Sequence, residues 1–354
     1  MGFKVLIFGA SYGSLLGAKI ALAGHDVTLA CLPAEAALIN KDGLRIRLPV
    51  KGIDGLVALE RRHMRGKVAG AAPTDLDPKG FDLVALAMQE PQYRSAGVRE
   101  LLDKVALARV PCMSIMNMPP LPYLARLPGL DLKALERCFA DPTVWRNFDP
   151  TFMTLCSPDP QAFRPPEEPS NVLQVSLPTN FKSARFERDE HTALLERLQD
   201  DIEAARIDVG GKPVELPVKL KVHDSVYVPL AKWCMLLTGN YRCIGKDGMR
   251  PIKDAVHADA AASRAVYDWV KALCRKIGAA EADLVPFEKY AAAAMGLAKP
   301  SSAARALAAG ATHIERVDLL VQSIAASKGL KSAEVDATVA LVDGWLAANR
   351  KKTG

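Results

Sequence analysis

Short apolar runs alternate with helix-forming segments through the first third of the chain. An aliphatic run at residues 4–8 is followed by a glycine-rich turn and by an apolar helical segment that stops at Gly24. Further apolar runs stand at residues 27–31, 81–87 and 110–116. Continuous apolar runs of this length suit strands buried on both faces of a parallel sheet. Their alternation with helices predicts an α/β fold with a doubly wound sheet of the Rossmann type.

The middle of the chain has a different pattern. Residues 117–169 carry repeated proline pairs and Asp-Pro steps, which interrupt regular elements and predict a proline-rich insertion at about 119–169. Residues 171–187 resemble strands, and the charged run at 190–205 resembles an exposed helix that leads to Gly210-Gly211. We therefore expect a domain boundary close to these two glycines.

Beyond Pro217 the apolar positions recur at helical spacing. This predicts a dinucleotide-binding domain at residues 1–212 and an all-α domain for substrate binding or dimerisation at 213–354. The broad apolar faces of the last two helices suit a homodimer contact and burial within one chain equally well. The positions that define the helical pattern include Val256, Val266, Leu273, Val317, Leu320, Ile324, Val335, Val342 and Trp345.

Composition agrees with a two-domain soluble protein. The chain has 354 residues, of which 49% are hydrophobic and 24% charged, and its formal net charge is +6. A charge this modest, with no long basic run, favours a small anionic ligand over nucleic acid. We expect a cytoplasmic protein without a membrane partner, because residues 1–8 show no basic leader or long apolar stretch. The seven cysteines contain no C-x-x-C pair, so we expect reduced, mostly buried thiols and no metal site.

The glycine turn carries the first candidate chemistry. Glycines between a strand and a helix let the backbone approach a pyrophosphate, whose charge is stabilised by the helix N-terminus. Ser11 stands where the second glycine of G-x-G-x-x-G is usual, and the turn is one residue short. The residues expected at the cofactor are Gly9, Ser11, Tyr12, Gly13 and Ser14.

The end of the second strand should carry the choice between NAD and NADP. An Asp or Glu there would hold the ribose diol, and an Arg would favour a 2′-phosphate. The sequence has Cys31, Leu32 and Pro33 instead. NAD and NADP therefore both stay open, and so does a turn that has lost its dinucleotide.

A second candidate is Lys232, which follows Pro229 at the predicted start of a helix. Leu236 and Asn240 lie four and eight residues further, on roughly the same face. A partly desolvated ammonium near the positive end of a helix gives up its proton more easily, as a general acid must.

Together these residues resemble the ketopantoate reductase family, whose helical domain is similar to that of 6-phosphogluconate dehydrogenase. The resemblance rests on the glycine turn, Asn117 after a later strand, Lys232 with Asn240, the Lys-Pro-Ser-Ser segment at 299–302, and Glu315. It implies an NADPH-dependent reductase of small 2-oxo acids, with the substrate between two domains. It further implies Lys232 as proton donor, Glu315 as orienting group, and a set of binding residues: Asn117 for cofactor or substrate, and Asn240, Ser301 and Ser302 for substrate.

Three functional hypotheses follow. The leading one is an NAD(P)-dependent dehydrogenase acting on CH–OH groups, which reduces a small 2-oxo acid with Lys232 as general acid. NADP is favoured by the resemblance alone. An opine- or imine-type dehydrogenase that reduces a C=N bond shares this architecture. A non-catalytic ligand-binding or sensor protein is the third hypothesis, because Ser11 and Cys31 alter the two positions that usually read the cofactor.

Overall fold

The computed structural model describes residues 2–353, which form two compact units. Unit 1 comprises residues 2–88, Gln92–Tyr123 and Val144–Val226. Unit 2 comprises Gln89–Pro91, Leu124–Thr143 and residues 227–353. Among the described residues, no helix is both long enough and apolar enough to cross a membrane.

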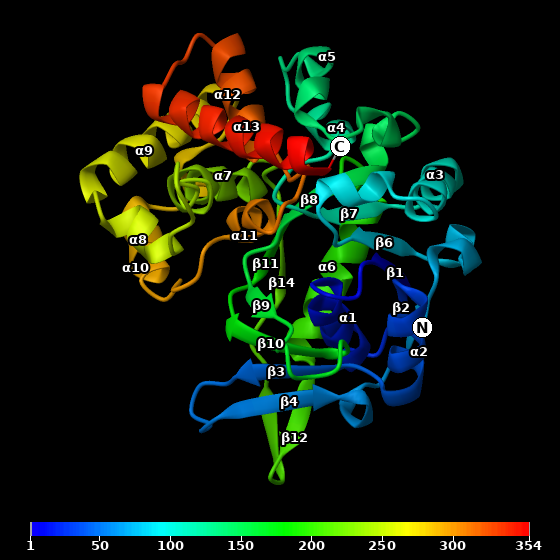
Figure 1. Cartoon of the computed structure of the whole chain (residues 1–354). Helices are drawn as coiled ribbons and strands as arrows, with labels where there is room; N and C mark the ends of the chain where they lie inside the picture. The colour runs from blue at the N-terminus through cyan, green and yellow to red at the C-terminus, as the bar shows by residue number, and fades with distance from the viewer. Residues whose placement is uncertain (1, 354) are drawn as a thin grey trace. The chain divides into compact units, whose positions relative to one another are not determined.

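Unit 1 is built on an eight-stranded sheet (Figure 1). Its first six strands run β5-β2-β1-β6-β7-β8 and pair in parallel, which is the Rossmann order 3-2-1-4-5-6. β11 joins β8 in antiparallel orientation, and β14 joins β11 in parallel. The prediction of a doubly wound sheet is therefore confirmed. The strands are β1 (Lys4–Phe8), β2 (Asp26–Ala30), β5 (Val68–Ala71), β6 (Leu83–Leu86), β7 (Cys112–Ile115), β8 (Met153–Ser157), β11 (Phe181–Ala184) and β14 (Leu220–His223).

Helix α1 (Gly13–Leu22) is buried along its whole length, and its sequence explains why. Its residues are apolar or small all round except for one lysine and one serine, which is the pattern of a helix covered on every side. It packs against β1, β2 and β3 and also against α6. The other helices of eight or more residues in unit 1 are α2 (Pro33–Asp42), α3 (Val98–Ala108) and α6 (Asp189–Ala204).

The segment 119–169 contains regular strands, although its prolines predicted an irregular insertion. It supplies β8, which pairs with β7 inside the main sheet, and β9 of a second sheet. That sheet runs β4-β3-β10-β9 and contains β3 (Arg45–Pro49), β4 (Leu56–Glu60), β9 (Gln161–Phe163) and β10 (Val172–Leu177). The prolines fall between these strands, where they need not donate to a strand ladder.

The two glycines expected at a boundary form the tip of a hairpin instead. Gly210 and Gly211 have φ of 62° and 81°, and they connect β12 (Arg206–Val209) to β13 (Lys212–Glu215). A two-residue hairpin with positive φ at both positions strongly favours glycine. The chain then returns to the main sheet through β14.

Unit 2 is predominantly helical, as predicted. Asp259 caps α9 by accepting from the Ala262 N–H, and it separates α8 from α9 within the predicted helical run. All seven cysteines of the chain are buried free thiols. The α-helices of this unit after Tyr227 are α7 (Lys232–Met235), α8 (Ile252–His257), α9 (Ala260–Lys276), α10 (Phe287–Ala294), α11 (Ser302–Ala308), α12 (Val317–Ser327) and α13 (Ala333–Thr353).

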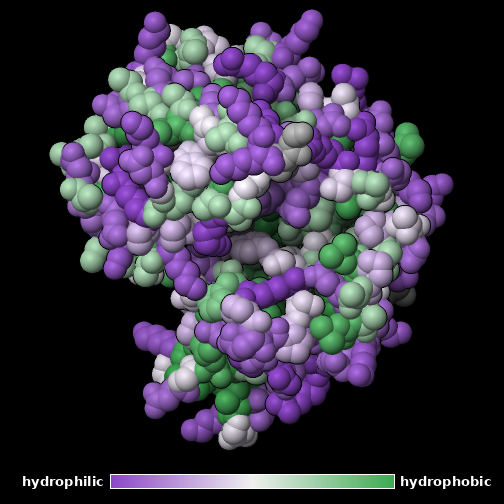
Figure 2. Space-filling view, in the orientation of Figure 1, coloured by the Kyte–Doolittle hydropathy of each residue, from purple (hydrophilic) through white to green (hydrophobic). Residues whose placement is uncertain are grey.

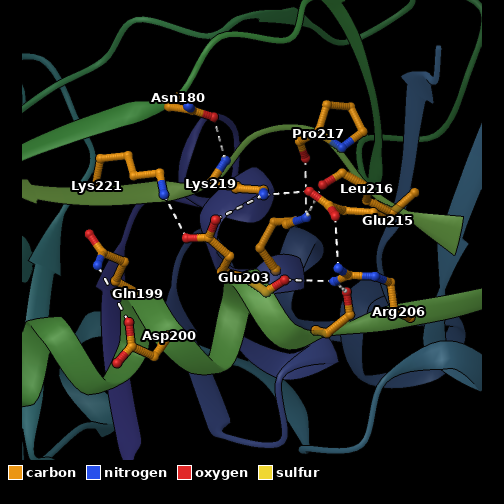
Figure 3. Close-up of polar contacts among 12 residues, drawn as sticks. Asn180, Gln199, Asp200, Glu203, Arg206, Glu215, Leu216, Pro217, Lys219 and Lys221 are labelled. Carbon is orange, nitrogen blue, oxygen red and sulfur yellow. Dashed lines mark hydrogen bonds and ion pairs between the residues drawn. The ribbon is translucent and has the colours of Figure 1, made fainter.

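A buried lysine joins α1 to the strand connection before β14. Lys19 is 1% exposed, and its ammonium donates to the carbonyls of Leu216 and Pro217 at 3.0 and 3.1 Å. Burial, and secondarily the charge of Lys219, lower the pKa of Lys19 from 10.5 to about 7. Figure 3 shows the chain of alternating charges beside it, formed by Lys221, Glu203, Lys219 and Glu215.

The face drawn in Figure 2 is largely hydrophilic, with apolar residues in separate small patches. Scattered apolar residues of this kind are ordinary on a protein surface. Five large apolar side chains are exposed among the described residues: Leu32, Leu56, Leu107, Phe163 and Met295.

Candidate functional site

The carboxyl ends of four neighbouring parallel strands gather the first candidate residues. β2, β1, β6 and β7 end just before Cys31, Gly9, Met88 and Asn117. In open α/β sheets, ligands bind outside the carboxyl ends, where the strand order reverses. Here the order reverses between β1 and β6, so the glycine turn and Asn117 lie on the edge where such a ligand binds.

The glycines of the turn have distinct roles. Gly9 has φ of +95°, and a Cβ on it would lie 2.7 Å from Met88 Cγ and 3.1 Å from the Ala87 carbonyl oxygen. A Cβ on Gly13 would lie 2.6 Å from Ile7 Cγ2. Gly9 therefore makes the tight turn and Gly13 allows close packing of α1 on β1, which are two of the three glycine roles in dinucleotide-binding turns. Ser11 is exposed and occupies the place of the glycine that faces the pyrophosphate.

Replacing Gly13 by alanine is expected to destabilise the protein by about 1–3 kcal/mol, because α1 must move away from Ile7. The matched control is Gly17→Ala in the same helix. There the new Cβ meets Val27 Cγ1 at 3.2 Å, and the higher helix propensity of alanine offsets the tighter contact. Urea unfolding of both variants measures the difference. Equal stabilities of the two variants would contradict this role of Gly13.

The polar side chains of the turn are engaged within unit 1. Ser14 is 2% exposed, and its hydroxyl donates to the Ala10 carbonyl. The Tyr12 hydroxyl donates to the Pro160 carbonyl at 2.8 Å, and burial raises the pKa of Tyr12. The exposed Ser11 is thus the side chain of the turn best placed to meet a ligand, whereas Ser14 and Tyr12 hold the turn in shape.

A charged pair that the sequence did not predict lies beside the turn. Arg164, which follows β9, donates through Nη2 to the Ala10 carbonyl at 2.9 Å and through Nη1 to Glu35 Oε1 at 2.5 Å. The pair also acts on the Cys31 thiol, although burial is the main cause that raises the pKa of Cys31 to about 11. The backbone cradle at Gly9, the exposed Ser11 and this charged pair fit the phosphates and ribose of a dinucleotide.

In unit 2, Lys232 begins a helix that changes its winding. A 3₁₀ turn with Pro229 leads into α7, which continues as a π-helical segment at Leu236–Asn240. Eight residues of regular α-helix would place Asn240 about 80° around the axis from Lys232. A π segment turns less per residue, so it reduces that offset and brings Lys232 and Asn240 closer to one face. Both residues are partly exposed. Single π turns occur frequently at functional sites.

Tyr290 of α10 contacts both the start and the interior of the π segment. The Tyr290 hydroxyl donates to the carbonyl of Met235, the residue immediately before the segment, at 3.1 Å. A Cβ on Gly239 would lie 2.0 Å from the same hydroxyl. Glycine at 239 therefore makes room for the Tyr290 hydroxyl beside the π segment.

Gly239→Ala is expected to destabilise the protein by about 1–3 kcal/mol, and part of this loss should disappear when Tyr290 is phenylalanine. Removing the hydroxyl removes the atom that the new methyl group would strike. Unfolding of the two single variants and the double variant measures a coupling, for which we expect about 1 kcal/mol. Simple additivity would contradict direct competition for this space. The double variant should still be less stable than Tyr290→Phe alone, because the new methyl group also meets Ile252 Cγ2 at 3.0 Å.

The neighbouring serines Ser301 and Ser302 differ in exposure: the first is buried and the second is exposed. Ser301 is 3% exposed, and its hydroxyl donates to the Asn240 carbonyl at 2.6 Å and accepts from the Ala304 N–H. It therefore caps α11 and joins that helix to the end of the π segment. Ser302 is exposed and is the member of the pair better placed for a ligand.

Glu315 is buried rather than on a solvated helix face. It is 8% exposed and precedes α12, and its Oε1 accepts from the Glu90 N–H at 3.3 Å. The Tyr241 hydroxyl donates to the Glu315 carbonyl and accepts from the Val317 N–H at 3.0 Å. Because Tyr241 directly follows Asn240, the structure connects the start of α12 to the π segment. Hydrogen bonds within unit 2 thus connect Ser301 to Asn240, and Glu315 to Tyr241, the residue after Asn240.

These features define a class: an α/β protein with a Rossmann-type unit, whose strand order reverses at a glycine turn, followed by a helical unit. No family model matches the sequence, and no curated protein matches it either.

Solved structures do resemble it. A ketopantoate reductase of the PanE/ApbA family from Ralstonia eutropha JMP134 has a TM-score of 0.60 at 16% identity, covering 98% of this chain and 99% of the other. A 2-dehydropantoate 2-reductase from Methylococcus capsulatus has a TM-score of 0.62 at 13% identity, covering 98% and 97%. D-mandelate dehydrogenase, solved with NADH and anilino(oxo)acetate, has a TM-score of 0.62 at 14% identity, covering 98% and 99%. The resemblance to ketopantoate reductases is confirmed for the fold, which extends along nearly the whole of each chain.

Proposed function

We propose that the protein is a nicotinamide-dependent oxidoreductase that reduces a small 2-oxo acid. The observation that carries the proposal is the glycine turn at the strand-order reversal, where Gly9 and the exposed Ser11 form a cradle for a pyrophosphate. The similar structures support it, since they include a 2-dehydropantoate 2-reductase and a D-mandelate dehydrogenase solved with NADH. A homodimer and a cytoplasmic location stay predictions of the sequence.

The proposed chemistry assigns one step to each side chain. A bound reduced nicotinamide supplies the hydride to the carbonyl carbon. Negative charge then develops on the carbonyl oxygen, and the Lys232 ammonium stabilises this charge and donates the proton that completes the hydroxyl group. Asn240 and Ser302 offer hydrogen bonds to the substrate carboxylate. Glu315 is assigned the orienting role, and its main-chain carbonyl accepts from the hydroxyl of Tyr241, the residue after Asn240. Asn117, on the edge of the sheet, is assigned to the cofactor or to the substrate.

The test has two stages. Fluorescence titration with NADH and NADPH measures binding, and cofactor oxidation is then followed with a panel of 2-oxo acids that includes 2-dehydropantoate and benzoylformate. Binding of at least one cofactor and turnover of at least one acid are expected. Failure of both cofactors to bind at millimolar concentration would overturn the proposal. Turnover that requires an added amine would instead indicate an imine reductase, and binding without any turnover would indicate a sensor.

A further inference from the structure

We propose that Glu35, held in place by Arg164, selects the cofactor by accepting the hydroxyl groups of the adenosine ribose, so that the protein takes NADH in preference to NADPH. This inference rests on the proposed function, because it assigns a role at the same cofactor site. It also gives a role to the proline-rich segment, which carries Arg164.

Glu35 lies where a ribose-binding acid is needed. β2 ends at Ala30, and α2 begins at Pro33, so Glu35 is in the first turn of the helix that follows the second strand of the Rossmann order. Acids at the end of this strand hold the ribose diol in NAD-binding domains. The residues directly after β2 carry no charge, and the structure places the carboxylate one turn further along the chain.

Arg164 fixes this carboxylate against the glycine turn. The arginine is 129 residues away in sequence, yet its guanidinium bonds Glu35 Oε1 at 2.5 Å and the Ala10 carbonyl at 2.9 Å. The planar fork of a guanidinium sets the direction of both bonds. The side chains of Glu35 and Arg164 are 19% and 28% exposed, so the pair is largely shielded but still reachable by a ligand.

The direction of the preference follows from charge. Oε1 of Glu35 is engaged by Arg164, which leaves Oε2 to accept from a ribose hydroxyl. A 2′-phosphate at this place would bring a dianion close to the carboxylate, and the guanidinium that could neutralise it is already bonded to Glu35 and Ala10. Like charges at short range disfavour NADPH.

Exposed apolar side chains flank the pair in sequence. Leu32, 69% exposed, immediately precedes α2, and Phe163, 38% exposed, immediately precedes Arg164. Two of the five exposed large apolar residues of the described chain thus lie within three residues of Glu35 or Arg164 in sequence. Apolar surface beside a carboxylate suits an adenine ring next to its ribose.

The experiment compares dissociation constants of NADH and NADPH, measured by fluorescence titration. The wild type is expected to bind NADH at least tenfold more tightly. In Glu35→Gln the NADH affinity should fall by about tenfold while the NADPH affinity rises, so the ratio of the two changes by more than tenfold. Glu35→Asp keeps the charge and should keep the preference for NADH. Arg164→Met should weaken NADH binding, because it releases the carboxylate.

Glu168→Gln is the matched control. Glu168 pairs with Arg47 at 2.5 Å, and their side chains are 25% and 27% exposed. The substitution therefore removes a similar ion pair elsewhere in unit 1. It should leave both affinities unchanged. Equal weakening of both cofactors in Glu35→Gln would show a structural role only and overturn the proposal. A wild type that prefers NADPH would also overturn it while the proposed function stands. A wild type that binds neither cofactor would overturn both.

Discussion

Lys232→Ala is expected to lower kcat for reduction of a 2-oxo acid by about 10²–10⁴-fold, the usual contribution of a positioned general acid. The affinity for NADH or NADPH should stay nearly unchanged, because the lysine is assigned to the carbonyl oxygen rather than to the nicotinamide. Hydride transfer without a proton donor would leave an alkoxide, which is far less stable than the hydroxyl product at neutral pH. Steady-state kinetics with the best acid of the panel, combined with cofactor titration, measures both effects.

Two further variants make the test specific. Lys232→Arg keeps the positive charge but replaces the ammonium with a group that does not release its proton in proteins, so it should recover substrate binding more than turnover. Lys276→Ala removes an exposed lysine from α9 and should keep full activity. Full turnover in Lys232→Ala would reject the assignment of the proton donor, although cofactor binding could still support a dehydrogenase.

Much of the fold could be predicted from local patterns. The strand, turn and helix at residues 4–22 follow from an apolar run, Gly9 and Gly13, and the structure places β1 and α1 there. The helices that carry Val317 and Val335 follow from helical spacing in the same way. β8 was missed because it is five residues long and lies among prolines. Its pairing with β7 is a long-range contact that periodicity does not contain.

The site was less predictable, because its new features depend on contacts between distant residues. Arg164 and Glu35 are 129 positions apart, and Arg164 directly follows β9, a strand of the second sheet. The π segment packs against Tyr290, which lies about 50 residues beyond it. One signal was present in the sequence: Gly239 interrupts an otherwise regular helical run, and a glycine inside a helix usually has a packing reason.

Replacement of Lys19 by methionine is expected to remove a rise in the stability of unit 1 between pH 7 and pH 9. The pKa of Lys19 is about 7 in the folded protein and 10.5 in an exposed chain. Between these values the unfolded chain binds a proton that the folded state does not, so the free energy of unfolding increases with pH. From pH 7 to pH 9 this amounts to about 2.3 kcal/mol, because half of the folded molecules still carry the proton at pH 7. Well below pH 7 both states are protonated, so the contribution of Lys19 to the free energy of unfolding is constant there and at its least favourable.

The diagnostic quantity is the pH dependence of the difference between Lys19→Met and the wild type. Methionine leaves the carbonyls of Leu216 and Pro217 without their donor, which costs about 1–3 kcal/mol at every pH. Relative to the wild type, the variant should therefore lose stability as the pH rises from 7 to 9. Hydrogen exchange of the β1 and α1 amides, corrected for the intrinsic rate at each pH, reports on unit 1. Lys221→Met, which removes a lysine of the neighbouring ion pairs whose side chain is 34% exposed, should show no such trend. A constant difference between Lys19→Met and the wild type would mean that Lys19 keeps its proton throughout, held by the two carbonyls and by Glu215 despite its burial.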